Sequence, residues 1–320
     1  MIEQFNRDGT LRHLITLANL NRTQLNALLD HAETYLVGHA HYAPREPRLL
    51  GRTVALLFFE PSTRTRVSFH LAATRLSADV VTLDGDASSR VKGETLLDTV
   101  RTLEAMHTDV FVVRTAEAGI PALLAGHIGR GKALINAGEA HCEHPTQGLL
   151  DVLTIRQHKP DIRNLCVAIV GDIRHSRVAR SAAQALGILD VGELRLVGPE
   201  PLLPDTNEFD GAVRYAELEP GLRDADVIMA LRIQRERMRK EAGIPSNDAY
   251  FKRFGLTAER LKAARGDVIV MHPGPINREV EISSAVADGP HSVIGRQVTN
   301  GVAVRMAVLA RIAEGLSGTP

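Results

Sequence analysis

The fold and the ligand class of this chain are indicated by one stretch, Phe58-Phe59-Glu60-Pro61-Ser62-Thr63-Arg64-Thr65-Arg66. An apolar run stops at its proline, which is typical of a strand that ends near Glu60 and a helix that begins near Ser62. The first backbone N–H groups of such a helix and the positive end of its dipole attract an anion. Arg64 and Arg66 add planar donors that suit phosphate or carboxylate, so the stretch predicts an anion site.

The same stretch also fits an ordinary helix start. In that interpretation Ser62 or Thr63 caps the helix and the two arginines are solvated. The lysine and the glycines of the Walker phosphate loop are absent from it. The stretch alone therefore leaves a phosphate site and a simple capped helix open.

Composition limits the class of protein. A chain of 320 residues suits two domains, and 44% apolar with 24% charged residues is typical of a soluble globular protein. Lys+Arg and Asp+Glu balance at 38 each, which argues against a nucleic-acid or anionic-membrane partner. Two cysteines, a polar N-terminus and no long apolar stretch predict a cytoplasmic protein without a disulfide framework.

Short β-branched runs alternate with helical patterns through both halves of the chain. The expected strands are residues 53–59, 79–83, 110–114, 133–137, 166–171, 193–197, 213–215, 226–230 and 267–271. The expected helices are one capped by Asn21 and continuing through Leu36, then residues 66–76, 95–106, 120–125, 146–157, 177–186 and 298–316. This alternation predicts an α/β fold with two domains, each a parallel sheet flanked by helices.

Basic and polar side chains follow the expected strands. In open α/β sheets the ligand lies beyond the carboxyl ends of the strands. The segments at those ends are residues 62–66, 84–92, 114–115, 141–147, 172–177, 232–234 and 272–278. Arg, Lys, His, Thr and Gln predominate there, which favours anionic ligands and the polarisation of an oxygen over a metal site or a covalent nucleophile.

The run His141-Cys142-Glu143-His144 offers a competing metal interpretation. A structural zinc site needs four ligands, and no second Cys/His cluster supplies the remainder. We therefore expect no metal and no cofactor.

Six strings, taken together, resemble one known family. They are Ser62-Thr63-Arg64-Thr65-Arg66, Lys92-Gly93-Glu94-Thr95, His144-Pro145-Thr146-Gln147, Gly171-Asp172 with Arg177, Arg232-Ile233-Gln234-Arg235-Glu236-Arg237 and His272-Pro273-Gly274-Pro275. In this order they are similar to the aspartate carbamoyltransferase catalytic chains of the aspartate/ornithine carbamoyltransferase superfamily. The resemblance implies transfer of a carbamoyl group from carbamoyl phosphate to the amine of L-aspartate, which gives N-carbamoyl-L-aspartate and phosphate in pyrimidine synthesis.

The resemblance also implies the domains and the roles of the site residues. It implies a carbamoyl-phosphate-binding domain over residues 1–147, an aspartate-binding domain over 148–291 and a C-terminal helix over 292–320 that returns to the first domain. Carbamoyl phosphate would be bound by Ser62, Thr63, Arg64, Thr65, Ser88, Arg114, His144, Gln147, Gly274 and Pro275. Aspartate would be bound by Lys92, Arg177, Arg232 and Gln234. Thr65, Arg114 and His144 would be catalytic, because they would polarise the carbamoyl carbonyl.

A homotrimer with shared active sites is a further implication. Ser88 and Lys92 would be inserted into the active site of the neighbouring subunit. The chain has His-Pro-Gly-Pro-Ile-Asn-Arg where some relatives carry a bulkier residue at Gly274. Association with a regulatory chain or with dihydroorotase therefore stays open.

Three rival functions remain to be weighed. An ornithine-type carbamoyltransferase shares the phosphate motif, but it must bind a cationic side chain, whereas Arg177, Arg232 and Lys92 suit a diacid. A dinucleotide-binding oxidoreductase is indicated by the run from Val167 to Asp172, although the second and third glycines of its fingerprint are missing. A non-catalytic scaffold subunit would be expected to lack some site residues.

Overall fold

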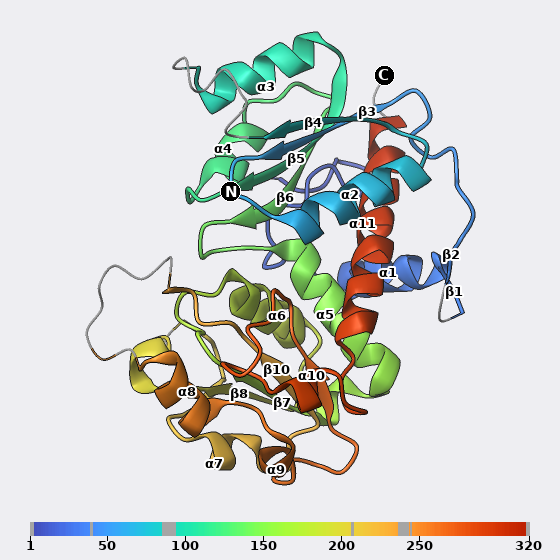
Figure 1. Ribbon diagram of the computed structural model, residues 1–320. Helices are drawn as coiled ribbons and strands as arrows, with labels where there is room; N and C mark the ends of the chain where they lie inside the picture. Colours follow the sequence, from blue (N-terminus) through green and yellow to red (C-terminus); the bar gives the residue numbers. More distant parts are fainter. Residues whose placement is uncertain are drawn as a thin grey trace. The chain divides into compact units, whose positions relative to one another are not determined.

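The computed structural model describes residues 3–38, 41–84, 94–205, 208–235, 243 and 245–317 (Figure 1). The chain divides into two compact units, of which one is Met1–Leu150 with Asn300–Pro320 and the other is Asp151–Thr299. Each unit contains a parallel sheet flanked by helices. The predicted fold class is therefore confirmed.

The first unit is built on a four-stranded sheet with the order β4-β3-β5-β6. Its strands are β3 (Thr53–Phe58), β4 (Asp79–Asp84), β5 (Thr108–Thr115) and β6 (Ala133–Glu139). Its helices are α1 (Arg22–Thr34), α2 (Thr63–Arg75), α3 (Leu96–Ala105), α4 (Ile120–Ala125) and the start of α5 (Pro145–His158). A two-residue pairing of β1 (Leu36–Val37) with β2 (His41–Tyr42) follows α1.

Burial on both faces explains the continuous apolar runs within β3 and β5. Every residue of the central strand β5 is buried. Phe111 and Val113 face one side and join a core with residues of α3 and α4, because side chains alternate along a strand. The opposite side is covered by α2, which packs on β3 and β4.

The second unit is built on a five-stranded parallel sheet with the order β11-β10-β7-β8-β9. Its strands are β7 (Cys166–Val170), β8 (Glu193–Val197), β9 (Val213–Tyr215), β10 (Val227–Ala230) and β11 (Ile269–Met271). Its helices are α6 (Arg177–Ile188), α7 (Leu218–Leu222), α8 (Asn247–Phe254), α9 (Ala258–Leu261) and α10 (Ser284–Ala287), with short 3-10 turns at Ile162–Asn164 and Glu200–Leu202.

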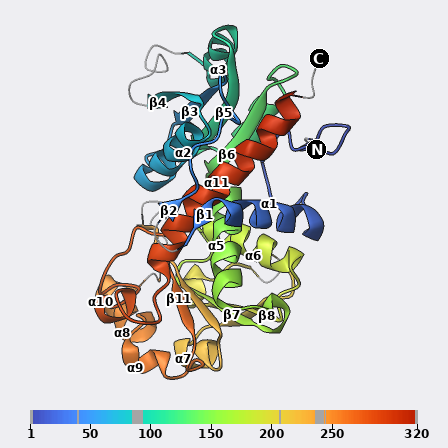
Figure 2. The ribbon, with the colours of Figure 1, turned by 90° about the vertical axis from the view of Figure 1, so that its right-hand side faces the viewer.

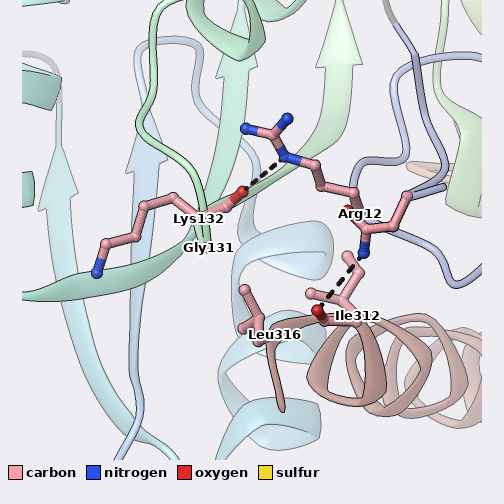
Figure 3. A pocket seen from close by; sticks show the side chains of 7 residues that line it. Arg12, Gly131, Lys132, Ile312 and Leu316 are labelled. Carbon is pink, nitrogen blue, oxygen red and sulfur yellow. Dashed lines mark hydrogen bonds between the residues drawn. The ribbon is translucent and has the colours of Figure 1, made fainter. Parts of the chain in front are cut away.

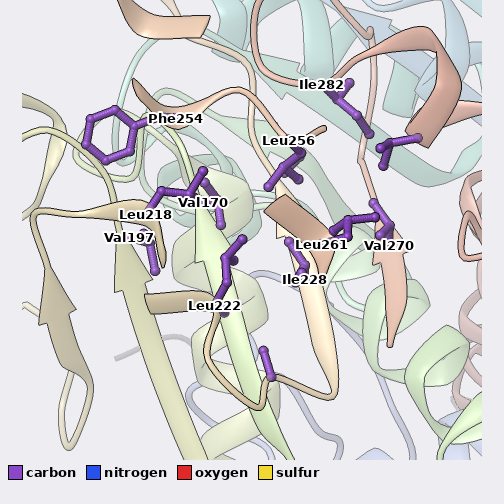
Figure 4. Packing of buried hydrophobic residues seen from close by; sticks show 14 of the residues in the cluster. Val170, Val197, Leu218, Leu222, Ile228, Phe254, Leu256, Leu261, Val270 and Ile282 are labelled. Atoms are coloured by element: carbon purple, nitrogen blue, oxygen red, sulfur yellow. The ribbon is translucent and has the colours of Figure 1, made fainter. Parts of the chain in front are cut away.

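One hydrophobic core fixes the strands of this second sheet to the helices of one face. Figure 4 shows Val170, Ile228 and Val270 of three neighbouring strands among apolar side chains that include Leu222 of α7 and Phe254 of α8. Burying each large apolar side chain contributes roughly 1.5 to 3 kcal/mol. The carboxyl ends of β7, β10 and β11 are thereby held in fixed register.

Helix α11 (Ile294–Ser317) returns the chain to the first unit as one unbroken helix (Figure 2). Its residues from Asn300 onward belong to the first unit. There the guanidinium of Arg305 lies over the ring of Phe69 in α2, with 5.0 Å between its carbon and the ring centroid. The predicted return of a C-terminal helix to the first domain is confirmed.

The N-terminal helix is shorter than its apolar spacing predicts. Asn21 caps α1 as expected, because its side chain accepts from the backbone N–H of Gln24. The helix ends at Thr34, however, and Leu36 pairs with Tyr42 in the β1–β2 ladder. The expected continuation of the helix to Leu36 is wrong, since backbone pairing with a later segment competes with the helix there.

Candidate active site

In the first unit, predicted site residues follow three neighbouring strands. β3 pairs with β5, and β5 pairs with β6, all in parallel. The segment Ser62–Thr65 follows β3, Arg114 is near the end of β5, and His144 and Gln147 follow β6. The backbone N–H of Phe59 donates to the carbonyl of Arg114, which fixes the end of β3 beside that of β5. The structure therefore brings this set to one edge of one sheet.

Helix α2 begins at the predicted anion-binding stretch. Ser62 is its N-terminal flanking residue in an extended conformation, and its side chain makes no capping hydrogen bond. Thr63 and Arg64 are exposed, whereas Thr65 is buried. Of the two interpretations of this stretch, the one in which the Ser62 hydroxyl caps the helix does not match the structure.

Thr65 and His144 meet although 79 positions separate them in the chain. The hydroxyl Oγ1 of Thr65 lies 3.5 Å from Nε2 of His144. His144 is 3% exposed and directly precedes α5, and Gln147 in the first turn of that helix donates its backbone N–H to the His144 carbonyl. A hydroxyl and an imidazole that lie side by side can both donate hydrogen bonds to a single ligand oxygen.

Arg114 is held at the strand end by two acceptors. Its Nη1 donates to the carbonyl of Ala137 at 3.2 Å, and its Nη2 donates to Oε1 of Glu60 at 3.2 Å. The arginine is 8% exposed. These two hydrogen bonds hold the guanidinium in one orientation, whereas the guanidinium of a flexible surface arginine adopts many.

Glu60 is a residue to which the sequence analysis assigned no role beyond marking the strand end. The structure makes its carboxylate the ion-pair partner of Arg114, 54 positions away. Glu60 is the one acid within a stretch that also contains two arginines. This lone acid is the feature of the sequence that could have indicated an ion pair. An acid in that place can orient a neighbouring cation as well as neutralise part of its charge.

The second unit repeats the strand-end arrangement with a different set. β7 pairs with β10, and β10 pairs with β11, again in parallel. Arg177 follows β7, and Arg232 and Gln234 follow β10. Gly274 and Pro275, which a cis peptide bond joins, follow β11. The structure therefore brings these residues to the carboxyl ends of three neighbouring strands.

A buried aspartate joins two of these segments. Asp172 is fully buried, and its Oδ1 accepts from the backbone N–H of His175 at 3.2 Å and from Nδ1 of His175 at 2.9 Å. Its Oδ2 accepts from the backbone N–H of Gln234 at 3.1 Å. Gln234 Nε2 in turn donates to the carbonyl of His175 at 3.2 Å. The loop before Arg177 and the segment after β10 are thus tied together, a role that the sequence analysis did not assign to Asp172.

Arg177 is the first residue of α6 and is 4% exposed. Ser176 caps this helix by accepting from the backbone N–H of Ala179 at 3.1 Å. The cap fixes where α6 begins and therefore fixes the backbone from which the Arg177 side chain extends. A buried cation at a helix start is suited to a carboxylate ligand.

Gly171, the glycine that prompted the dinucleotide interpretation, is required by the packing of the backbone. Its φ is +133°, and a Cβ at this position would collide with the carbonyl oxygen of Leu231. Only glycine therefore fits where β7 and the segment after β10 approach each other. The requirement comes from backbone packing, which accounts for this glycine without a bound pyrophosphate.

The predicted residues Ser88 and Lys92 lie outside the described residues. Among the residues that the structure does describe, no group of three His, Cys, Asp or Glu side chains is arranged to hold a metal ion. Burial raises the pKa of the Cys166 thiol to about 12, so this cysteine is a poor nucleophile near neutral pH. Within the same part of the chain, no helix is both long enough and apolar enough to cross a bilayer.

A small pocket lies elsewhere in the first unit (Figure 3). It is lined in part by Arg12 and Lys132, but both cations already have partners. Arg12 donates to the carbonyls of Lys132 and Gly129 at 3.4 and 3.1 Å, and the Lys132 ammonium lies 3.6 Å from Asp109. None of its lining residues belongs to the predicted set, so this pocket is not part of the candidate active site.

Two family models match nearly the whole chain. Residues 12–157 match the carbamoyl-phosphate-binding domain of the aspartate/ornithine carbamoyltransferases, and residues 163–312 match their aspartate- or ornithine-binding domain. The chain belongs to the aspartate/ornithine carbamoyltransferase family. The resemblance drawn from the six strings is confirmed, and the protein is a transferase.

Solved structures of other carbamoyltransferases share this fold. An aspartate transcarbamoylase from Trypanosoma cruzi, in complex with carbamoyl aspartate and phosphate, is 30% identical with a TM-score of 0.84 over 94% of this chain and 95% of that one. The same enzyme in complex with carbamoyl phosphate and aspartate is 28% identical with a TM-score of 0.83, over 94% and 96%. An ornithine carbamoyltransferase from Pyrococcus furiosus is 27% identical with a TM-score of 0.83, over 97% and 98%. Similarity of this degree to both types leaves the acceptor of this carbamoyltransferase to be argued from its residues.

Proposed function

We propose that this carbamoyltransferase is an aspartate carbamoyltransferase, which converts carbamoyl phosphate and L-aspartate to N-carbamoyl-L-aspartate and phosphate for pyrimidine synthesis. The first unit binds carbamoyl phosphate through the residues at the ends of β3, β5 and β6. The second unit binds aspartate through Arg177, Arg232 and Gln234. The alternative acceptor is ornithine.

The observation that carries this choice is the charge at the ends of β7 and β10. Aspartate presents two carboxylates, and Arg177 and Arg232 supply two guanidiniums from neighbouring strand ends. Ornithine would need an acid for its side-chain ammonium. Both oxygens of the buried Asp172 already accept hydrogen bonds from His175 and Gln234. The second unit therefore offers its cations, and not this carboxylate, to an amino-acid ligand.

The chemistry follows from positioning and electrostatics. The aspartate nitrogen attacks the carbamoyl carbon, the carbon–oxygen bond to phosphate breaks, and the departing phosphate accepts the proton that the amine loses. Thr65, Arg114 and His144 donate to the carbonyl oxygen as negative charge develops on it. Gln147 accepts from the carbamoyl NH2 group. Orientation of the two substrates contributes about 7 kcal/mol or more.

A competition assay tests the acceptor. The protein receives labelled carbamoyl phosphate with equal concentrations of aspartate and ornithine, and the two carbamoylated products are separated. We expect a preference for aspartate of about 10⁴-fold in kcat/KM, because ornithine carries only one carboxylate and would bring its ammonium group to the guanidinium that pairs with the second carboxylate of aspartate. Citrulline formation at an equal or higher rate would show that the acceptor is ornithine.

We also propose a homotrimer in which Ser88 and Lys92 complete the neighbouring subunit's site. The family resemblance of the string Lys92-Gly93-Glu94-Thr95 supports this proposal. Two inactive variants, Lys92→Ala and His144→Ala, are mixed, dissociated and reassembled. Because one kind of site in a mixed trimer contains neither substitution, we expect part of the wild-type activity to return. A mixture that stays inactive after confirmed subunit exchange contradicts shared sites.

A further inference from the structure

Strand β6 bulges opposite Arg114. The parallel pairing of β5 with β6 changes register there, so that two residues of β6, Ala137 and Gly138, lie opposite this single residue of β5. The φ of Gly138 is +126°, a value that L side chains rarely adopt. The carbonyl of Ala137, which accepts from Nη1 of Arg114 at 3.2 Å, belongs to this bulge. Because a bulge redirects the groups beside it, the bulge determines where one of the two acceptors of the guanidinium lies.

Two buried polar side chains of β6 hold the bulge. Oδ1 of Asn136 accepts from the backbone N–H of Gly138 at 2.9 Å. Its Nδ2 donates to Oε2 of Glu139 at 3.1 Å and to the carbonyl of Ile15 at 2.9 Å, so its partners assign the orientation of the amide. Oε1 of Glu139 accepts from the backbone N–H of Gly119, which precedes α4. Asn136 and Glu139 are both buried, so a donor that lost its acceptor here would stay unsatisfied.

The backbone of Glu139 closes the loop that leads to His144. Its N–H donates to the carbonyl of Glu143 at 2.8 Å, and its carbonyl accepts from the backbone N–H of Cys142 at 2.9 Å. The hydroxyl of Thr16 donates to Oε1 of Glu143 at 3.0 Å and holds the same loop from the N-terminal segment. The loop is thus closed on Glu139 directly before His144, and a shift of Glu139 would displace the imidazole.

We propose that Glu139 is a positioning residue for two of the groups that polarise the carbamoyl carbonyl. Its carboxylate orients Asn136 and ties the end of β6 to the start of α4. That end of β6 carries both the acceptor of Arg114 and the loop of His144. The inference rests on the proposed function, in which Arg114 and His144 donate to this carbonyl, and every group that it invokes belongs to the first unit. A merely structural role would lower the stability of the protein without changing the polarisation of a bound carbonyl.

Glu139→Gln is the variant that tests this role. Glutamine has nearly the size of glutamate, but its amide has only one acceptor oxygen. In either orientation, the amide turns its NH2 group toward a donor, which is the Gly119 N–H or Nδ2 of Asn136. One of the two hydrogen bonds is therefore lost, and the carboxylate no longer holds the end of β6 against α4.

Phosphonoacetamide, labelled with carbon-13 at its carboxamide, reports the polarisation directly. It has a methylene in place of the bridging oxygen of carbamoyl phosphate, so it binds without reacting. Donors to the carbonyl oxygen withdraw electron density from the carbon and move its NMR resonance downfield. We expect a downfield shift on binding to the wild-type protein and a clearly smaller shift with Glu139→Gln. In the same variant, kcat falls about tenfold, because one buried donor loses its acceptor, whereas the KM for aspartate is unchanged.

Asp109→Asn is the matched control. Asp109 is a second buried carboxylate of the same sheet, near the amino end of β5. It accepts from the backbone N–H of Thr53 at 2.9 Å and from Nη1 of Arg52 at 3.0 Å. We expect urea unfolding to show a loss of stability in this variant, while its carbonyl shift and kcat remain those of the wild-type protein.

Each other outcome contradicts the proposal. An unchanged carbonyl shift or an unchanged kcat in Glu139→Gln overturns the role of Glu139 alone, and so do equal losses of kcat in Glu139→Gln and Asp109→Asn. A wild-type protein that does not bind phosphonoacetamide, or that binds it without a downfield shift, overturns the proposed function together with this inference. If Glu139→Gln does not fold, Asn136→Ser replaces it, since its hydroxyl can accept from Gly138 but it lacks the amide that donates to Glu139. An unchanged carbonyl shift in Asn136→Ser is then the overturning result.

Discussion

The Arg114→Ala variant is expected to transfer the carbamoyl group about a thousandfold more slowly than the wild-type protein. The guanidinium is buried and held in one orientation by Ala137 and Glu60, so its charge is already placed when charge develops on the carbonyl oxygen. Alanine removes that charge together with its ion pair to Glu60. Initial rates at saturating carbamoyl phosphate and aspartate give the change in kcat.

Two further variants separate the charge of Arg114 from its placement. Arg114→Lys keeps a positive charge but has no planar fork for two anchors, so we expect an activity between those of alanine and wild type. Glu60→Gln keeps an oxygen that can accept from Arg114 and should lose much less activity than Arg114→Ala. Urea unfolding of each variant shows whether the fold is intact. A folded Arg114→Ala protein with a wild-type rate would exclude Arg114 from the mechanism.

Replacing Arg177 with alanine is expected to raise the KM for aspartate about a thousandfold. The side chain is buried at the start of α6. A substrate carboxylate that pairs with it there loses its hydration at little net cost, because a charge-assisted hydrogen bond replaces the water. Loss of this cation would leave one aspartate carboxylate desolvated and unpaired. The affinity for carbamoyl phosphate should stay the same, because its proposed contacts in the first unit are intact. Steady-state kinetics with each substrate varied in turn measures both quantities.

Arg180 provides a matched control on the same helix. It lies one turn after Arg177, but its Nη1 donates to the carbonyl of Arg174 and its Nη2 pairs with Glu208. Arg180→Ala removes the same number of atoms and the same charge, so it should affect stability more than the KM for aspartate. Equal increases in KM for both variants would contradict a specific contact between Arg177 and the substrate.

The sequence predicted the sheets well because parallel strands are buried on both faces. β5 is buried along its whole length around the apolar run of residues 110–113, and each expected apolar run in the sequence corresponds to a strand. The short helices α8, α9 and α10 were not predicted. Their caps are present, since Ser246, Thr257 and Ser283 each accept a backbone N–H. These three helices, of four to eight residues, contain too few apolar positions to establish a helical period, unlike the predicted α4, whose six residues are all apolar.

The sequence indicated the cationic residues of the candidate site but not the acidic residues beside them. The strand-end rule selected Arg114 and Arg177 because parallel strands place their carboxyl ends at one edge. The partners of buried polar groups depend on tertiary contacts between distant positions, such as the 62 residues that separate Asp172 from Gln234. Glu60 likewise became recognisable only through the guanidinium from which it accepts a hydrogen bond.

Helix α11 has a consequence for biosynthesis. Most of its residues from Asn300 to Leu316 are buried, and Arg305 covers Phe69 of the first unit, yet they are translated after the whole of the second unit. On the ribosome, the first sheet therefore emerges long before the helix that completes its unit. The second unit, which is continuous in the chain, can complete its core earlier, so the later unit in the sequence is expected to mature first.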